Sequence, residues 1–365
     1  MKKKIIVNKN GLLEINLKNL EHNYKILKGT SSPSNLAAVL KSDCYGLGSE
    51  RILKKLVELG CDHFFLTSLE ESIFIRQKSK NTKIILLNGI INLTKNDFYK
   101  ILNFKIIPVI NSFDELKKFN SFLKETNSSH PLIFHFDTGI NRLGISECDQ
   151  RKIIDYCKTN KFEIYMIMSH LASADQPTSQ FNKIQREKFK KITKNFENFR
   201  LSLANSHATI NFKDCKYDIT RSGGALFGTI VNKNLKNIIN FKSRILQIKE
   251  INSNHEFFGY NATFQSKQKK RIAILGCGYA DGYPRVLSNK SFAFFKKKLP
   301  ILGSISMDYM TVDVTDLNRM EINVGDFIEL IGDNISINEI AEKSNTIPYE
   351  ILNNIGFRAK KIYID

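Results

Sequence analysis

The sequence AVLKSDCYGLG, residues 38–48, joins an apolar run to a polar loop that contains glycine. The run ends at Lys41, and Tyr45 follows four residues later, directly before Gly46. A lysine at the end of a buried strand is costly to desolvate unless its charge is removed or used. Position alone favours the simpler interpretation, in which the side chain leaves the core for water. The rest of the chain decides between these two interpretations.

Short apolar runs recur through the first 230 residues, separated by longer segments with helical spacing such as ERILKKLVELG and NSFDELKKFNSFLKE. Buried runs that alternate with helices are typical of a parallel sheet, and eight of them predict closure into a barrel. A helix-like segment, LKNLEHNYKILK, precedes the first run, so the order could be offset from the simplest barrel. The eight runs lie at residues 36–40, 63–67, 84–88, 106–110, 132–136, 164–169, 201–205 and 217–220.

The pattern changes after about residue 235, where β-type runs such as RIAILGCGY and VGDFIELIG alternate with Gly, Pro and Asp turns. Two short helices, ISINEIAEKS and PYEILNNIG, are expected near the end. The predicted fold class is therefore α/β, with an N-terminal (β/α)8 TIM-like barrel over residues 11–235. A mainly β C-terminal domain follows over 236–365, and residues 1–10 could pack with it.

Composition excludes several functional classes. The formal net charge is +19, yet the lysines are spread along the chain and no nucleic-acid-binding motif is present. The six cysteines form neither a CxxC pair nor a dense framework, which favours reduced thiols in a cytoplasm and no metal site. The start has too few apolar residues for a signal peptide, and no run is long enough to span a membrane. We therefore expect neither nucleic acid nor membrane as a partner.

Polar residues follow the predicted strands at the end where a parallel barrel collects its active site. Each has a simpler explanation, since a lone histidine is often structural and a serine often caps a helix. At one barrel mouth they would form one pocket, with a lysine, basic groups and a Ser/Gly/Gly set suited to phosphate. A lysine opposite a phosphate cradle is the minimum requirement for pyridoxal phosphate. The set comprises Lys41, Asp137–Arg142, Ser169–His170, Asn205–Ser206 and Arg221–Gly224.

Nine motifs spread from about residue 11 to 363 carry a family resemblance, and GYADGYPR together with SMD and the lysine motif is highly specific. In this order they resemble the alanine racemases, which implies a barrel plus a β domain and pyridoxal 5′-phosphate as the cofactor. The motifs are LKSDCYGLG, FDTGINRLGI, SHLASAD, ANS, RSGGALFG, FFGYNATF, GYADGYPR, GSISMDYMTVD and TIPYEIL.

The resemblance implies two catalytic bases. Lys41 would hold the cofactor as a Schiff base and act on one face of the substrate Cα, and Tyr260 would act on the other face, as racemisation requires. Tyrosine has an ordinary pKa near 10, so it needs cationic or hydrogen-bonding neighbours to act as a base. His170 and Arg221 match that chain. Arg221 also matches the residue facing the pyridine nitrogen, where a permanent charge would restrain transamination.

The resemblance also implies the binding positions. Arg142 and the backbone of Met307 match the positions that hold the substrate carboxylate. Tyr279 and Asp308 match positions at the active-site entrance and the dimer contact. Tyr260 and Met307 reach the barrel of the other subunit in this family, which implies a homodimer with composite sites. The positions that match phosphate ligands are Tyr45, Ser206, Gly223, Gly224 and Tyr349.

The chain departs from the family pattern at three positions. His135 stands where many relatives carry a lysine, often carbamylated, and a neutral imidazole cannot supply the negative charge beside Arg142. A chloride, a water network or a shifted Arg142 is expected to replace it. Asn261 follows Tyr260 where glycine is usual and could constrain that loop. Ser202 stands where a histidine commonly precedes the ANS motif.

The implied function is interconversion of L-alanine and D-alanine, supplying D-alanine for peptidoglycan. The main alternative is a racemase of broader specificity that serves serine, lysine or arginine, because the motifs do not fix the side-chain pocket. A decarboxylase of the same architecture would be expected to carry an acidic residue in place of Arg221 and to lack Tyr260. A binding protein built from a single barrel would lack the β domain.

Overall fold

The computed structural model describes residues 9–196, 198–252 and 255–365, which divide into two compact units. The barrel unit contains Glu21–Cys44 and Ser49–Leu226. The β unit contains the chain up to Leu20, the segment Tyr45–Gly48 and Phe227–Asp365.

The barrel unit is built on eight parallel strands in the order β8-β7-β6-β5-β4-β3-β2-β9. Backbone bonds join the two outermost strands, because the Asp218 N–H donates to the Leu201 oxygen (3.1 Å) and the Arg221 N–H to that of Ala204 (2.9 Å). The predicted (β/α)8 barrel is therefore confirmed. The strands are β2 (Asn35–Val39), β3 (His63–Leu66), β4 (Lys83–Leu86), β5 (Ile106–Ile110), β6 (Pro131–His135), β7 (Glu163–Met168), β8 (Arg200–Ser202) and β9 (Ile219–Ser222).

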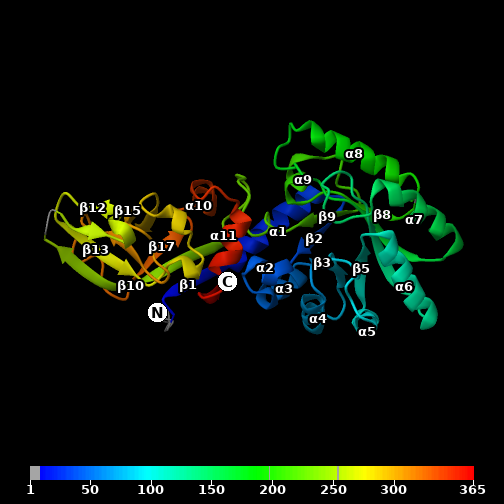
Figure 1. The fold of residues 1–365 in the computed structure, drawn as a ribbon, viewed down its shortest axis with the longest axis horizontal. Helices are drawn as coiled ribbons and strands as arrows, with labels where there is room; N and C mark the ends of the chain where they lie inside the picture. Colours follow the sequence, from blue (N-terminus) through cyan, green and yellow to red (C-terminus); the bar gives the residue numbers. More distant parts are fainter. Residues whose placement is uncertain (1–8, 197, 253–254) are drawn as a thin grey trace. The chain divides into compact units, whose positions relative to one another are not determined.

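Helices alternate with these strands and lie around them (Figure 1). Helix α6 shows the local logic: the Ser112 hydroxyl caps it by accepting from the Glu115 N–H (3.1 Å), and Leu116 and Phe119 bury its apolar face. The helices are α1 (Leu17–Ser31), α3 (Ser49–Glu58), α4 (Leu69–Lys78), α5 (Lys95–Asn103), α6 (Phe113–Glu125), α7 (Glu147–Thr159), α8 (Gln180–Thr193) and α9 (Ser206–Asn211).

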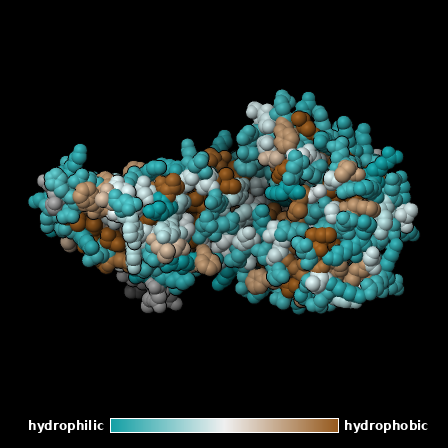
Figure 2. Space-filling view, viewed as in Figure 1, coloured by the Kyte–Doolittle hydropathy of each residue, from teal (hydrophilic) through white to brown (hydrophobic). Residues whose placement is uncertain are grey.

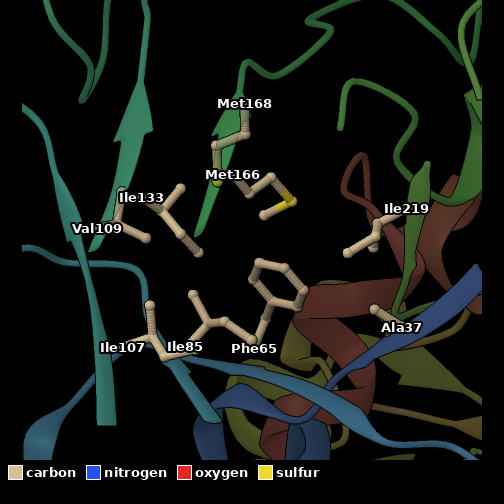
Figure 3. Packing of buried hydrophobic residues seen from close by; sticks show 9 residues of the cluster. All are labelled: Ala37, Phe65, Ile85, Ile107, Val109, Ile133, Met166, Met168 and Ile219. Carbon is tan, nitrogen blue, oxygen red and sulfur yellow. The ribbon is translucent and has the colours of Figure 1, made fainter. Parts of the chain in front are cut away.

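The interior of the barrel is filled by apolar side chains that alternate along the strands. Phe65 lies at the centre of this cluster, with Ile85 and Met166 beside it (Figure 3). Alternate residues of a strand point to the same face, so these positions define the inward phase of each strand. The cluster consists of Ala37, Phe65, Ile85, Ile107, Val109, Ile133, Met166, Met168 and Ile219.

The β unit is an eight-stranded sheet in the order β13-β16-β15-β14-β17-β10-β1-β18, with β10 also paired to β13. Its strand β1 (Gly11–Asn16) pairs with β10 antiparallel and with β18 parallel. Residues 11–16 thus lie in this sheet, and the division at residue 235 stays a prediction. The other strands are β10 (Ile239–Ile251), β13 (Lys270–Leu275), β14 (Phe292–Phe295), β15 (Lys297–Leu302), β16 (Met310–Asp313), β17 (Phe327–Ile331) and β18 (Lys360–Ile364).

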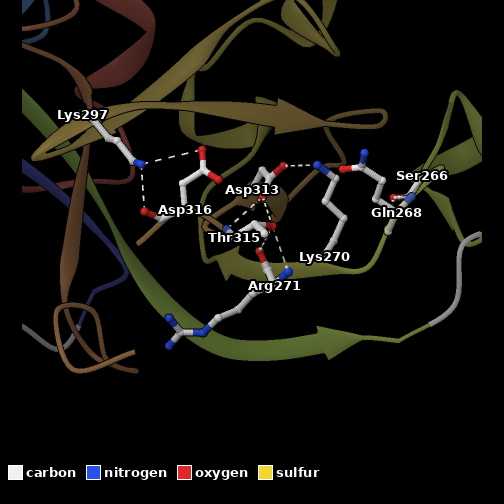
Figure 4. A network of polar contacts seen from close by, with 8 residues as sticks. All are labelled: Ser266, Gln268, Lys270, Arg271, Lys297, Asp313, Thr315 and Asp316. Carbon is white, nitrogen blue, oxygen red and sulfur yellow. Dashed lines mark hydrogen bonds and ion pairs between the residues drawn. The ribbon is translucent and has the colours of Figure 1, made fainter. Parts of the chain in front are cut away.

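The β unit also holds the short hairpin of β11 (Phe257–Phe258) and β12 (Phe264–Gln265) and the two expected helices, α10 (Ile337–Lys343) and α11 (Pro348–Ile355). Polar side chains join β13 to the end of β16 and to the turn that follows β16 (Figure 4). The Lys270 ammonium lies 2.7 Å from the Asp313 carboxylate, which also accepts from the Thr315 N–H (3.0 Å). This ion pair fixes the turn that follows β16.

Hydrophilic side chains cover most of the face seen in Figure 2, with separate apolar patches between them. Within the ranges that the structure describes, no helix is long and apolar enough to cross a membrane.

Candidate functional site

Five polar residues continue the inward phase of the barrel strands at their C-terminal ends. His135 lies two positions after Ile133 on β6, and Arg221 lies two positions after Ile219 on β9. The alternation that fills the core with apolar side chains therefore turns these polar ones toward the same end of the barrel. The other members are Lys41 after β2, Asn111 after β5 and His170 after β7.

The residues after Lys41 form a left-handed turn, the α2 segment Lys41–Tyr45. Ser42, Asp43 and Cys44 have φ between 49° and 56° and ψ near 50°, and Tyr45 has a φ of 57°. None of them is glycine, and this conformation costs an L-residue roughly 1–2 kcal/mol. The turn persists because neighbouring groups hold it, and such strain is typical of functional sites.

Burial lowers the pKa of the Lys41 ammonium, and the positive charge of Arg142 lowers it further, whereas Glu71 raises it. Lys41 is half-buried. The barrel therefore makes the ammonium easier to convert to the neutral amine, which is the nucleophilic and basic form of lysine.

Arg142 is exposed at the tip of the loop that follows β6. Asp137 shapes this loop, because its carboxylate accepts from the N–H groups of Gly139 (2.8 Å) and Asn141 (3.3 Å). The loop presents the guanidinium to solvent, available for a carboxylate.

Arg221 is buried in the barrel interior, and both terminal nitrogens of its guanidinium make hydrogen bonds. It donates to the Ser202 hydroxyl, to the Ser169 carbonyl (2.6 Å) and to the Leu203 carbonyl (3.4 Å). Burial lowers its pKa to about 10, so it stays charged at neutral pH. Ser202, the serine where a histidine is common, therefore has a defined partner.

His170 is held in the neutral state. Burial lowers its pKa well below the ordinary value, and the charges of Arg221, Arg142 and Lys41 act in the same direction. Its carbonyl accepts from the Gln185 amide (3.0 Å), which also bonds Thr138 (3.2 Å). Gln185 thus ties the loop after β6 to the loop after β7. The sequence analysis missed it, because a single glutamine on helix α8 carries no motif signal.

His135 is buried with a defined tautomer. The Asn111 amide nitrogen donates to the Leu87 carbonyl (3.2 Å), so the Asn111 amide oxygen is the acceptor for His135 Nδ1 (2.8 Å). Burial, together with the charges of Arg221 and Arg142, lowers the pKa of His135 to about 3. Nε2 is then a buried lone pair with no protein partner among the described residues. A lone pair accepts from a donor and repels chloride, which favours a water network or Arg142 as the expected replacement.

Ser206 joins the segments that follow β8 and β9. It begins helix α9 after the Asn205 cap, and its hydroxyl oxygen accepts from the Gly223 N–H (2.9 Å). Ser206, Gly223 and Gly224 all lie in buried positions. The two loops therefore form a small cradle of hydroxyl and backbone groups, the kind that binds phosphate.

Tyr45 belongs to the β unit, where its ring lies 6.0 Å from that of Tyr349 on α11. The segment after it packs tightly: the Tyr363 hydroxyl donates to the Leu47 carbonyl (2.8 Å). Gly48 has a φ of +92°, and a Cβ there would lie 2.1 Å from that hydroxyl oxygen. The two predicted phosphate tyrosines are thus brought together.

Tyr260 and Met307 are among the exposed residues of the β unit, 68% and 53% exposed. Tyr260 lies in a short 3-10 turn and lines a hollow of about 430 Å³ with Gly259, Ser304 and Tyr309. Asn261 takes a φ of +59°, a conformation that asparagine tolerates better than other non-glycine residues, so it replaces glycine at modest cost.

Tyr279 and Asp308 lie together with Met307. The N–H groups of Tyr279 and Ala280 donate to the carbonyls of Ser306 (3.1 Å) and Met307 (3.0 Å). Arg358, which the sequence analysis missed, pairs with Asp308 (2.8 Å) and with Asp281 (3.4 Å). The GYADGYPR and SMD motifs therefore lie side by side, joined by backbone hydrogen bonds and by the ion pairs of Arg358.

The donor set suits an aldehyde cofactor that carries a phosphate: an amine with a lowered pKa, a hydroxyl and backbone cradle, and a fixed cation. Across the described ranges, no group of three His, Cys, Asp or Glu side chains could hold a metal ion.

Comparisons with known proteins agree with this geometry. Residues 15–231 match the family model "Alanine racemase, N-terminal domain", and residues 238–363 match "Alanine racemase, C-terminal domain". An alanine racemase of Rickettsia rickettsii is 36% identical over 355 residues, covering 96% of this chain and 98% of that relative. One of Brucella abortus is 32% identical, covering 97% and 93%.

A solved structure adds the fold. The alanine racemase from Bartonella henselae, whose structure holds covalently bound pyridoxal phosphate, aligns with a TM-score of 0.91 and 32% identity. The alignment covers 97% of this chain and 99% of that one. Family models and relatives both span nearly the full length, and the chain therefore belongs to the alanine racemase family.

Proposed function

We propose that this protein interconverts L-alanine and D-alanine, using pyridoxal 5′-phosphate as its cofactor and Lys41 and Tyr260 as its two bases. Membership of the alanine racemase family over both domains supports the reaction. The proposal rests on one observation: Lys41, His170 and Arg221 continue the inward-facing positions of their strands at one end of the barrel.

Lys41 would hold the cofactor through its side-chain amine, and Ser206, Gly223, Gly224, Tyr45 and Tyr349 would hold the phosphate. When bound, pyridoxal phosphate supplies the electron sink that makes the Cα–H of an amino acid acidic. The lowered pKa of Lys41 supports its part, because more of the side chain is neutral amine at neutral pH.

Lys41 Nζ and Tyr260 Oη would exchange protons with the substrate Cα from opposite faces. Arg221 stays cationic and fixed by three hydrogen bonds, which suits a residue facing the pyridine nitrogen without giving up a proton. His170 is held neutral, so it can accept a hydrogen bond as part of the chain toward Tyr260.

Arg142 and the Met307 backbone would hold the substrate carboxylate, and the exposure of Arg142 at its loop tip supports this task. A neutral His135 would leave the full positive charge of Arg142 for the carboxylate, without the anion that a carbamate supplies. Tyr279 and Asp308 would line the entrance.

The assembly is a homodimer with composite sites, in which Tyr260 and Met307 serve the barrel of the partner subunit. Their exposure in the β unit supports this arrangement. The enzyme works in the cytoplasm, where it supplies D-alanine for peptidoglycan; cysteines that are not joined in disulfides within the described chain agree with a reducing compartment.

The test is D-alanine formation from pure L-alanine with added pyridoxal phosphate, by the wild type and by Lys41→Ala. We expect the wild type to form D-alanine and to retain the visible absorbance of the bound cofactor after gel filtration, and the variant to lose both. If Lys41→Ala kept both the absorbance and the activity, the role proposed for Lys41 would be wrong. Parallel incubations with L-serine and L-lysine would show a broader specificity.

A further inference from the structure

Glu71, a residue outside the set described above, contacts the turn that carries Lys41. It is the third residue of helix α4, where the Ser68 cap fixes its N–H (3.1 Å). One carboxylate oxygen accepts from the Asp43 N–H (3.1 Å), and the other accepts from the Thr67 hydroxyl (3.4 Å). The carboxylate thus bonds to the backbone two residues beyond Lys41.

The left-handed turn needs such support, because several strained residues follow one another in it. Its own backbone contributes a bond from the Cys44 N–H to the Leu40 carbonyl (3.1 Å). Side chains add to it: the Asp43 carboxylate accepts from the N–H (2.7 Å) and hydroxyl (2.8 Å) of Ser49. Asp43 therefore fastens the turn to helix α3, and Glu71 fastens it to helix α4.

The charge of Glu71 also acts on Lys41. Arg142 from the loop after β6 and Glu71 from α4 act on the ammonium with opposite signs, and His170 lies within electrostatic range as well. Glu71 is the only anion that raises the pKa of Lys41 among the groups acting on it in the described chain. It therefore limits how far burial and Arg142 shift the ammonium toward the neutral amine.

We propose that Glu71 is a positioning residue for Lys41: its carboxylate holds the left-handed turn in place and puts a negative charge against the turn that carries the Lys41 amine. The inference rests on the proposed function of Lys41. Glu70 provides a matched control, because it lies on the same helical turn, carries the same charge and is exposed.

Two substitutions separate the roles of charge and hydrogen bond. Glu71→Gln keeps an oxygen that can accept from Asp43 and removes the charge, whereas Glu71→Ala removes both. The first readout is the pH dependence of Lys41 reductive methylation, followed by mass spectrometry in the full-length chain freed of cofactor with hydroxylamine. The second readout is kcat and KM for L-alanine against pH in the enzyme with its cofactor.

Removing a nearby negative charge disfavours the ammonium, so the pKa of Lys41 falls. We expect Lys41 of Glu71→Gln to be methylated about threefold to tenfold faster than wild type below that pKa, the effect of one charge at an intermediate dielectric. The acid limb of kcat should move to lower pH, with KM nearly unchanged. Glu70→Gln should match the wild type. Glu71→Ala should additionally lose about tenfold or more in kcat, because the turn loses its anchor.

Equal methylation profiles for Glu71→Gln, Glu70→Gln and wild type would overturn the inference, even if the enzyme racemises alanine. The proposed function would fail separately, if the wild type formed no D-alanine while the methylation rates still differed. If Glu71→Ala does not fold, the near-isosteric glutamine variant decides alone.

Discussion

At the scale of single residues, His135 is the clearest case of burial deciding chemistry. Its only hydrogen-bonded nitrogen within the described ranges is Nδ1, and the ring is held neutral among cations. Neutrality follows from the cost of desolvating a charge beside Arg221 and Arg142, which outweighs the opposing effect of the Asp137 carboxylate.

His135 makes the stability of the fold sensitive to acid. Its pKa is about 3 in the native protein and about 6.5 when unfolded, so the unfolded chain binds the extra proton between these pH values. Stability should therefore fall as the pH drops from 6.5 toward 3, by up to about 1.4 kcal/mol per pH unit for one proton. Thermal unfolding of His135→Gln at pH 7.5 and pH 5, compared with wild type, measures this contribution.

We expect the melting temperature of His135→Gln to fall less between the two pH values than that of the wild type. The same change at His22, a half-exposed histidine of α1, serves as the control and should leave the acid sensitivity unchanged. Equal acid sensitivity in all three proteins would show that His135 is not the buried neutral histidine described here.

At the scale of elements, the segment after Lys41 needs a glycine at position 48, where its backbone lies against the Tyr363 side chain. Gly48→Ala would place a Cβ 2.1 Å from the Tyr363 hydroxyl at a φ of +92°, so we expect a loss of about 2 kcal/mol or more in unfolding free energy. Gly29→Ala on helix α1 is the control, because nothing lies within 4 Å of its Cβ. It should be neutral or stabilising by up to about 1 kcal/mol.

Chemical denaturation measures both variants. Adding Tyr363→Phe to Gly48→Ala should recover part of the loss, because it removes the clashing oxygen and leaves the backbone strain. If Gly48→Ala proved as stable as Gly29→Ala, the close packing of this segment would be refuted.

The positions of the barrel strands could be predicted to within a few residues, because a buried parallel strand has a short, continuous run of apolar residues. The phase of those runs also indicated which side chains would meet at the barrel mouth. The left-handed turn could not be predicted, since Ser42, Asp43 and Cys44 carry no signal for positive φ. The roles of Glu71 and Gln185 could not be predicted for another reason. Their partners lie far along the chain, and the pattern of residues in a helix does not reveal such contacts.

At the scale of the whole molecule, sequence patterns distinguished the barrel from the β domain. They did not assign every segment to the correct one of the two. Strand β1 pairs with β10 and β18, more than 200 residues away, and no local pattern reports such pairing. Tyr45–Gly48 likewise belongs with the β unit although it directly follows Cys44 of the barrel unit.

The proposed composite dimer predicts complementation between two inactive variants. Lys41→Ala damages a barrel, and Tyr260→Phe damages the residue that serves the partner's barrel. A dimer with one subunit of each variant would carry both defects in one site and neither in the other. About half of the dimers formed by unfolding and refolding an equal mixture are of this kind, so the mixture should recover roughly a quarter of wild-type activity. A mixture as inactive as its components would contradict shared sites, and refolded wild type controls for recovery.

The central claim is that Lys41 and Tyr260 move a proton to and from the two faces of alanine Cα. The most direct measurement follows L-alanine and, separately, D-alanine in D2O with enzyme and pyridoxal phosphate, by chiral chromatography and Cα deuterium content. We predict that both reactions converge on equal amounts of the two enantiomers with deuterium at Cα, and that Tyr260→Phe slows both at least about a hundredfold. The absence of D-alanine with the wild-type enzyme, or an undiminished rate in Tyr260→Phe, would contradict the account.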